Sequence, residues 1–108
     1  MRIDSVQLFR FSALTFNAHR IHYDRDYARG IEGYPGLVVH GPFAAMLLMD
    51  DLLRHRPQVR PSRFIVRATR PLFEGESFHL QSSASAHAEA FRVVNASGHV
   101  TMTAQVVI

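Results

Sequence analysis

The sequence predicts an α+β fold in which antiparallel strands wrap around one long helix. Residues 43–49 form an apolar run, FAAMLLM, bounded by Pro42 and Pro57. Proline suits the first position of a helix, and a helix that is apolar on all sides is typical of a buried one. We therefore expect a central helix near residues 42–56. From Ser62 onward the apolar residues alternate with a period of two, which is typical of strands.

The segment before the central helix is predicted to mix strand, loop and a short helix. Residues 1–16 are interpreted as strand-like, because β-favouring and apolar side chains alternate there in part. Asp24 is expected to cap a short helix over residues 25–29, and Gly30 to end it. Residues 37–40, LVVH, are predicted as a short apolar strand.

The segment after the central helix is predicted to form three or four antiparallel strands. The motif PLFEG marks one turn, and Ala-Ser-Gly-His marks the turn of a hairpin. The strands are expected over residues 64–68, over 77–90 as one strand or two, and over 91–95 and 100–108.

Length and composition limit the classes of protein to consider. The chain has 108 residues, which suits one domain, and a domain this small gains stability from a partner subunit. Cysteine is absent, which excludes disulfides and thiolate zinc sites. We see no signal peptide, and the longest apolar run is too short to cross a bilayer, so we expect a cytoplasmic protein with no membrane partner. All 12 basic residues are arginine and are spread along the chain, so no nucleic-acid partner is expected.

The stretch FSALTFNAHRIHYD, residues 11–24, concentrates polar chemistry between apolar residues. Its His22 can gain and lose a proton near neutral pH and lies in a predicted loop, so it is our candidate acid/base. One of seven histidines is more often a packing or surface residue, and that alternative stands beside the first. A metal site built from Asn17, His19, His22 and Asp24 is a further alternative, but the third ligand is unclear, and we expect neither metal nor cofactor.

A second candidate group lies at the start of the central helix. Gly41 offers a backbone N–H without an obstructing side chain, where the helix dipole adds positive potential; the alternative is a simple structural turn. His40 is interpreted as a packing residue or as a group behind the site. Arg63 and Arg67 share one face of a predicted strand, where they either meet phosphates of a carrier or form a solvated surface.

These motifs together resemble the MaoC-like hydratase/dehydratase family, which has the hotdog fold. Its motif reads roughly F-A-x-L-S-G-D-x-N-P-x-H-x-D, with a later A-H-G-M at the start of the central helix. By this resemblance Thr15 falls on the serine, Asn17 on the catalytic aspartate, and His22 on the catalytic histidine. Asp24 falls on the later aspartate and Gly41 on the donor to the substrate oxygen. PLFEGE at 71–76 resembles another turn of the family.

The resemblance implies a hydratase/dehydratase that acts reversibly on 2-enoyl and 3-hydroxyacyl thioesters of CoA or acyl carrier protein. The form FSALTFNxHRIHYD is similar to a sub-branch with mesaconyl-C4-CoA or itaconyl-CoA hydratases and mitochondrial 3-hydroxyacyl-thioester dehydratases. Residues 1–108 would then form a single hotdog domain like the catalytic C-terminal half of double-hotdog hydratases, paired with a second copy or another hotdog chain.

Within this interpretation His22, Asn17 and Gly41 are the expected catalytic residues, and Thr15, His40, Arg63 and Arg67 are expected to contact the substrate. Asparagine cannot take a proton, so His22 would carry the proton alone. Two alternatives stay open: a hotdog acyl-CoA thioesterase, for which Asp50 and Asp51 lie about two turns into the helix, and a non-catalytic thioester-binding subunit.

Overall fold

The computed structural model describes residues 1–84 and 88–108, and it has the predicted α+β class. Four strands form one antiparallel sheet in the order β1-β4-β3-β2. The strands are β1 (Arg63–Ala68), β2 (Phe78–Ala84), β3 (Ala88–Asn95) and β4 (Val100–Val107). The helices are α1 (Ser5–Thr15), the 3-10 turn η1 (Arg20–His22), α2 (Arg25–Gly30) and α3 (Gly41–His55).

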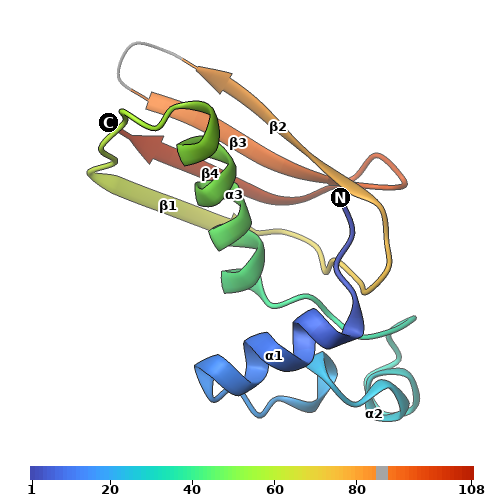
Figure 1. Ribbon diagram of the computed structural model, residues 1–108. Helices are drawn as coiled ribbons and strands as arrows, with labels where there is room; N and C mark the ends of the chain where they lie inside the picture. The colour runs from blue at the N-terminus through green and yellow to red at the C-terminus, as the bar shows by residue number, and fades with distance from the viewer. Residues whose placement is uncertain (85–87) are drawn as a thin grey trace.

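The helix α3 confirms the predicted central helix and lies across one face of the sheet (Figure 1). Its buried side chains, Ala44, Leu48 and Leu52, recur every four residues and pack into the core against the sheet. The expectation of burial on all sides is wrong for this chain, since Met46 on another side of the helix is 62% exposed. The sheet of one chain covers only one side of α3, so apolar side chains on its other sides, such as Met46 and Leu53, stay exposed.

The N-terminal segment is helical, so the expectation of a strand over residues 1–16 is wrong. Asp4 accepts a hydrogen bond from the backbone N–H of Gln7, and the Gln7 side chain accepts one from the backbone N–H of Asp4. This capping box satisfies two N–H groups at the start of α1. The helix ends at Phe16, which adopts a left-handed conformation with φ of 54°. Local capping therefore outweighed the partial alternation of apolar residues.

Residues 37–40 are extended but form no regular strand. They make one isolated bridge, between Val38 and Phe73. The backbone N–H of Val38 also donates to the carbonyl of Ile21, and the N–H of Val39 donates to that of Leu72. The segment thus runs between η1 and the turn before β2, and it fixes the start of α3 relative to both.

The three C-terminal strands confirm the period-two pattern, and the segment 77–90 contains parts of two strands, β2 and β3. The residues 85–87 in its middle lie outside the described residues. The side-chain oxygen of Asn95 accepts the N–H groups of Ser97 and His99 in the predicted hairpin turn, where Gly98 has φ of 84°. Within residues 1–84 and 88–108, no helix is long and apolar enough to cross a membrane.

Candidate active site

A cavity of about 350 Å³ opens where the extended segment enters α3. Its walls come from η1, the start of α3, the loop after β1 and the start of β4. Polar and charged groups on these walls include His22, His40, Arg70 and Thr101, and Gly41 contributes backbone. The structure therefore brings together His22 and Gly41, which are nineteen positions apart, and these are two of the three residues expected to be catalytic.

His22 is oriented by a single strong hydrogen bond. It ends the turn η1, is 8% exposed, and its Nδ1 lies 2.7 Å from the carbonyl oxygen of Val38. A carbonyl can only accept, so Nδ1 carries the hydrogen and Nε2 holds the free lone pair of the neutral ring. Burial lowers the pKa of His22 most, the bond to Val38 opposes this, and nearby His19 lowers it further. The side chain is thus a neutral base at neutral pH.

His40 packs directly on His22 and is almost fully buried. The two rings are stacked, with centroids 3.8 Å apart and planes 19° apart. Nε2 of His40 lies 2.7 Å from the hydroxyl oxygen of Ser12, a buried residue of α1. Burial and the charge that His22 can carry lower the pKa of His40 to about 4. His40 therefore stays neutral throughout the pH range in which His22 can work as a base.

Gly41 is the first residue of α3, and Pro42 follows it. The first N–H groups of a helix have no partner within the helix and point outward, toward the positive end of the dipole. His40 precedes Gly41 as the N-cap and provides no capping side-chain bond. A Cβ built on Gly41 would meet no described atom within 4 Å, so its position does not demand glycine for steric reasons. Its surroundings leave room for a ligand oxygen near this N-terminus.

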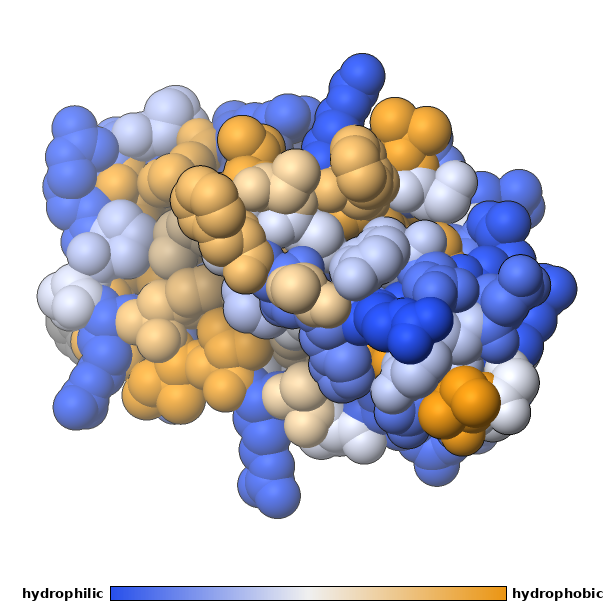
Figure 2. Space-filling model, turned by 90° about the horizontal axis from the view of Figure 1, so that it is seen from below, coloured by the Kyte–Doolittle hydropathy of each residue, from blue (hydrophilic) through white to orange (hydrophobic). Residues whose placement is uncertain are grey.

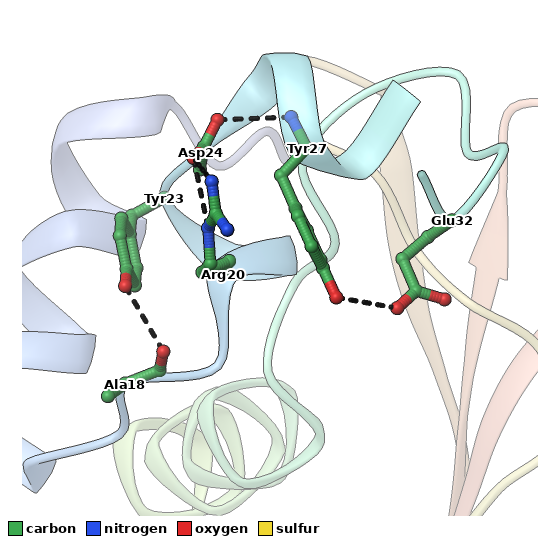
Figure 3. Close-up of polar contacts among 6 residues, drawn as sticks. All are labelled: Ala18, Arg20, Tyr23, Asp24, Tyr27 and Glu32. Atoms are coloured by element: carbon green, nitrogen blue, oxygen red, sulfur yellow. Dashed lines mark hydrogen bonds and ion pairs between the residues drawn. The ribbon is translucent and has the colours of Figure 1, made fainter. Parts of the chain in front are cut away.

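A set of polar contacts holds the turn that carries His22 (Figure 3). Arg20 binds Asp24 through Nε at 3.2 Å and Nη2 at 2.8 Å, and its guanidinium lies 4.4 Å above the ring centroid of Tyr27. Asp24 also caps α2 by accepting the backbone N–H of Tyr27, as predicted. Tyr23 donates to the carbonyl of Ala18. Asp24 therefore supports η1 and α2 from outside the cavity.

The structure places Asn17 and Thr15 away from this cavity. Asn17 lines a neighbouring hollow with Phe16 and Tyr23, and its side-chain oxygen accepts the backbone N–H of His19 at 3.1 Å. Thr15 is exposed, and its hydroxyl donates to the carbonyl of Phe11 within α1. Across the described residues, no group of three or more histidine or acidic side chains is placed to hold a metal ion.

Sequence reasoning passed over two residues that the structure brings to the site. Arg70 lines the cavity, whereas Arg63 and Arg67 are exposed along β1. The sequence signal for Arg70 was its place in the arginine-rich segment just before the PLFEG turn. Ser12 was overlooked because a strand was expected there; in a helix, one serine among apolar residues indicates a buried polar contact.

Two relatives with established names match about two thirds of the chain. Mesaconyl-C(4)-CoA hydratase of Chloroflexus aurantiacus is 62% identical over 73 residues, which are 68% of this chain and 26% of that protein. The mitochondrial hydroxyacyl-thioester dehydratase type 2 of Schizosaccharomyces pombe is 35% identical over 77 residues, or 69% of this chain and 26% of that protein. The chain thus spans about a quarter of the length of these curated relatives.

Solved structures match nearly the whole chain. HtdX of Mycobacterium tuberculosis has a TM-score of 0.86 at 22% identity and covers 99% of this chain and 42% of its own. The (R)-hydratase of A. caviae has a TM-score of 0.80 at 18% identity, with 99% and 87% covered. The 3R-hydroxyacyl-ACP dehydratase HadBC of Mycobacterium tuberculosis has a TM-score of 0.77 at 18% identity, with 98% and 86% covered. These likenesses show the hotdog fold.

The N-terminal helices, η1, the extended segment and α3 all fall within one family model, that of hydroxyacyl-thioester dehydratase type 2, which matches residues 1–74. The match includes both His22 and Gly41, together with the Ser12–His40 pair behind them. The chain belongs to the hydroxyacyl-thioester dehydratase type 2 family.

Proposed function

We propose that this chain provides the catalytic hotdog unit of a hydratase/dehydratase for 2-enoyl and 3-hydroxyacyl thioesters. The observation that carries the proposal is that His22, with a free Nε2, and Gly41, at the N-terminus of α3, line one cavity. Addition of water to an enoyl thioester needs these two functions, a base for the water and a hydrogen-bond donor for the thioester oxygen.

The proton follows a closed path in this scheme. Nε2 of His22 takes a proton from water as the water oxygen bonds to C3 of the substrate, and the π electrons move to the thioester oxygen as an enolate. The imidazolium then returns the proton to C2, the carbonyl re-forms, and the 3-hydroxyacyl thioester is complete. Dehydration is the same path in reverse. A positioned acid/base of this kind contributes about 10²–10⁴-fold in rate.

Gly41 acts on the charge that builds on the thioester oxygen. Its backbone N–H, at the positive end of α3, is the proposed donor to this oxygen. Loss of one such donor costs about 3 kcal/mol of transition-state stabilisation in well-characterised cases. Asn17, which was expected to be catalytic, lines a neighbouring hollow instead of this cavity, and its amide has no step in this scheme.

The basic residues near the cavity suit a substrate with phosphate groups. Arg70 lines the cavity, and Arg63 and Arg67 lie on β1, the strand that leads to it. Guanidinium groups bind phosphate through paired hydrogen bonds. CoA and the phosphopantetheine of an acyl carrier protein both present phosphates, and we propose that these arginines meet them.

The chain is proposed to work with a second hotdog unit, either another copy or a different chain. β1 pairs with β4 on one side and is otherwise an edge strand within the described sheet, and its Ile65 is 47% exposed. An exposed apolar edge is suited to pairing with another strand. Among the structural neighbours, the HadBC dehydratase is itself a complex of different chains.

The decisive assay offers the protein an unsaturated acyl-CoA and its saturated analogue, alone and with candidate partner subunits. Loss of enoyl absorbance with retained thioester supports the hydratase, and His22→Ala should abolish it while substrate binding remains. Release of free thiol from both substrates would instead support a thioesterase. Binding without turnover by every assembly would contradict the proposal in favour of a binding subunit. Neither Asp50 nor Asp51 lines the cavity of His22 and Gly41, which argues against these carboxylates as the base of a thioesterase.

A further inference from the structure

Ser12 and His40 form a buried polar pair that the proposed proton transfer does not use. Ser12 is 6% exposed and His40 is 1% exposed, and their side chains lie 2.7 Å apart between Oγ and Nε2. Burial of two polar groups costs free energy that their hydrogen bond only offsets, and apolar side chains at both positions would avoid this cost. Packing alone therefore does not explain the pair.

The ring of His40 is held by one hydrogen bond at its edge and by contacts with two neighbouring rings. Ser12 bonds to Nε2 on the edge, the ring of His22 stacks on the ring of His40 at 3.8 Å, and the ring of Phe11 lies 4.7 Å from it. Val38 in turn holds the far edge of His22. The carbonyl of Val38 and the face of His40 thus both hold the His22 ring, and His19 contacts it edge-on.

His40 also connects His22 with the proposed donor to the substrate oxygen. Its side chain stacks on His22, and its backbone is the N-cap of α3, directly before Gly41. A displacement of His40 would move both groups relative to the substrate. The hydrogen bond between Ser12 and His40, together with the ring contacts of Phe11, ties this junction to α1.

The charges around His22 require its stacking partner to be neutral. His19 packs edge-on against His22, with centroids 5.7 Å apart, and Arg70 lines the same cavity. A proton on His40 would place two cations in contact inside the protein, which burial opposes. A neutral His40 instead offers its ring face to the imidazolium that His22 becomes, a favourable arrangement for a cation.

We propose that His40, held by Ser12, is a positioning residue that keeps His22 as the single proton carrier of the stacked pair and fixes it relative to Gly41. The inference rests on the proposed function for its catalytic meaning. The arrangement of the rings and their protonation are properties of the free protein and can be measured without any substrate.

The first measurement is ¹⁵N NMR of the imidazole nitrogens between about pH 4 and pH 9, a range that spans ordinary histidine titration. In the wild type, His22 should show one tautomer, with the hydrogen on Nδ1, and its pKa should lie below the ordinary value of a histidine because the side chain is buried. In Ser12→Ala the His40 ring loses its edge contact and can shift, so the His22 ring stacked on it should turn away from the carbonyl of Val38 and show both tautomers. With its burial reduced, His22 should also titrate at higher pH. Ser12→Thr keeps the hydroxyl and should restore the wild-type pattern.

The second measurement is hydration of an enoyl-CoA by the same variants, each assayed together with any partner subunit that the wild type requires. Ser12→Ala should lower kcat by about tenfold or more with KM within about twofold, because misplacement of a catalytic group affects the transition state most. The acid limb of the pH profile of kcat for Ser12→Ala should move to higher pH, in step with the pH at which His22 titrates by NMR. His99→Gln is the matched control for loss of a histidine and should change neither readout.

The variant His40→Phe keeps the proposal testable if Ser12→Ala folds poorly, because it preserves a ring of similar size. It removes the nitrogen that Ser12 binds, so the same changes in tautomer and kcat are expected. The proposal is overturned if folded Ser12→Ala and His40→Phe both keep the wild-type tautomer of His22 and the wild-type kcat. A wild type with the expected tautomer and titration but no hydratase activity would refute the proposed function and still support the positioning of His22 by His40.

Discussion

Arg25 of α2 and Glu74 of the turn before β2 form an ion pair that closes the molecule around the extended segment. Nε of Arg25 lies 3.1 Å from Oε2 of Glu74, and a second guanidinium nitrogen bonds to the other carboxylate oxygen. The same Oε2 accepts the backbone N–H of Leu37 at 2.8 Å. Burial tends to raise the pKa of Glu74, but the bonds from Arg25 and Leu37 outweigh it and lower the pKa.

Glu74→Gln should lower the free energy of unfolding by about 1 kcal/mol, because hydrogen bonds to the charged carboxylate are weakened while the shape is kept. The carboxylate has a lowered pKa when folded, so the loss should be present above its unfolded pKa and should vanish as the pH falls through the folded value. Urea unfolding at neutral and acid pH measures both. Asp50→Asn, which removes an exposed pair with Arg54, should cost under about 0.5 kcal/mol.

The buried histidines should make the protein lose stability in acid. The pKa of His40 is lowered from 6.5 to about 4 in the folded protein. Between these two values His40 is therefore protonated in the unfolded chain but neutral in the folded one. The stabilisation is therefore complete above pH 6.5 and is lost as the pH falls toward 4. In His40→Phe the unfolding free energy should depend less on pH over this window. An unchanged slope in that variant would show that His40 is not the titrating group.

The variant Gly41→Ala distinguishes a structural role of Gly41 in the turn from a functional role in the cavity. The added methyl group meets no described atom within 4 Å and φ is not positive, so the free energy of unfolding should stay equal or rise by up to about 1 kcal/mol. Gly41 lines the cavity, so the methyl group should obstruct the substrate oxygen and lower kcat/KM by about tenfold or more. Gly30→Ala has equal space, so it should change the free energy of unfolding within the same range and leave kcat/KM unchanged, which controls for the substitution itself.

Asn17→Asp should preserve the fold, because the side-chain oxygen can still accept the N–H of His19. The new negative charge near His19 and His22 favours the protonated imidazole, so the acid limb of kcat/KM should move to higher pH. We expect activity to persist, because residue 17 lines a neighbouring hollow and not the cavity of His22 and Gly41. The pH profile of enoyl-CoA hydration measures this, and an unchanged acid limb would show that residue 17 does not act on His22.

Ile65→Lys tests the proposed pairing through β1. A lysine on an edge strand disfavours pairing with another strand, so light scattering should show a shift from dimer toward monomer. Ile31→Lys changes an isoleucine that is 73% exposed in the loop after α2, and it should leave the assembly intact. If both variants keep the mass of the wild type, the subunits meet elsewhere. The exposed apolar groups on the α1 side of the molecule are then the next surface to test (Figure 2).

The sequence predicted the parts of the fold that depend on local signals. Pro42 and the apolar run after it predicted α3, and alternation predicted the strands that follow. The same alternation gave a wrong prediction for residues 1–16, where a capping box of Asp4 and Gln7 starts a helix. The box depends on hydrogen bonds of two polar side chains, and the spacing of apolar residues carries no information about them.

The candidate site was predictable only in part, for a similar reason. His22 and Gly41 stand out by residue type and position, and the structure brings them to one cavity. The contact between Ser12 and His40 depends on how α1 crosses the start of α3, which no spacing in the sequence reports. Arg70 reaches the cavity because the loop after β1 turns back to it. Arg63 has the same guanidinium group but is exposed at the start of β1 and does not line the cavity.

The cavity walls have a consequence for how the protein matures. His22 comes from an early part of the chain, whereas Thr101 and Met102 come from β4, and all three line the same space. During synthesis the N-terminal helices and α3 therefore leave the ribosome well before the cavity can close. Contacts so distant in sequence form slowly compared with local helices. Until β4 inserts between β1 and β3, the nascent chain has its proposed base, His22, and its proposed donor, Gly41, but no enclosed site in which to use them.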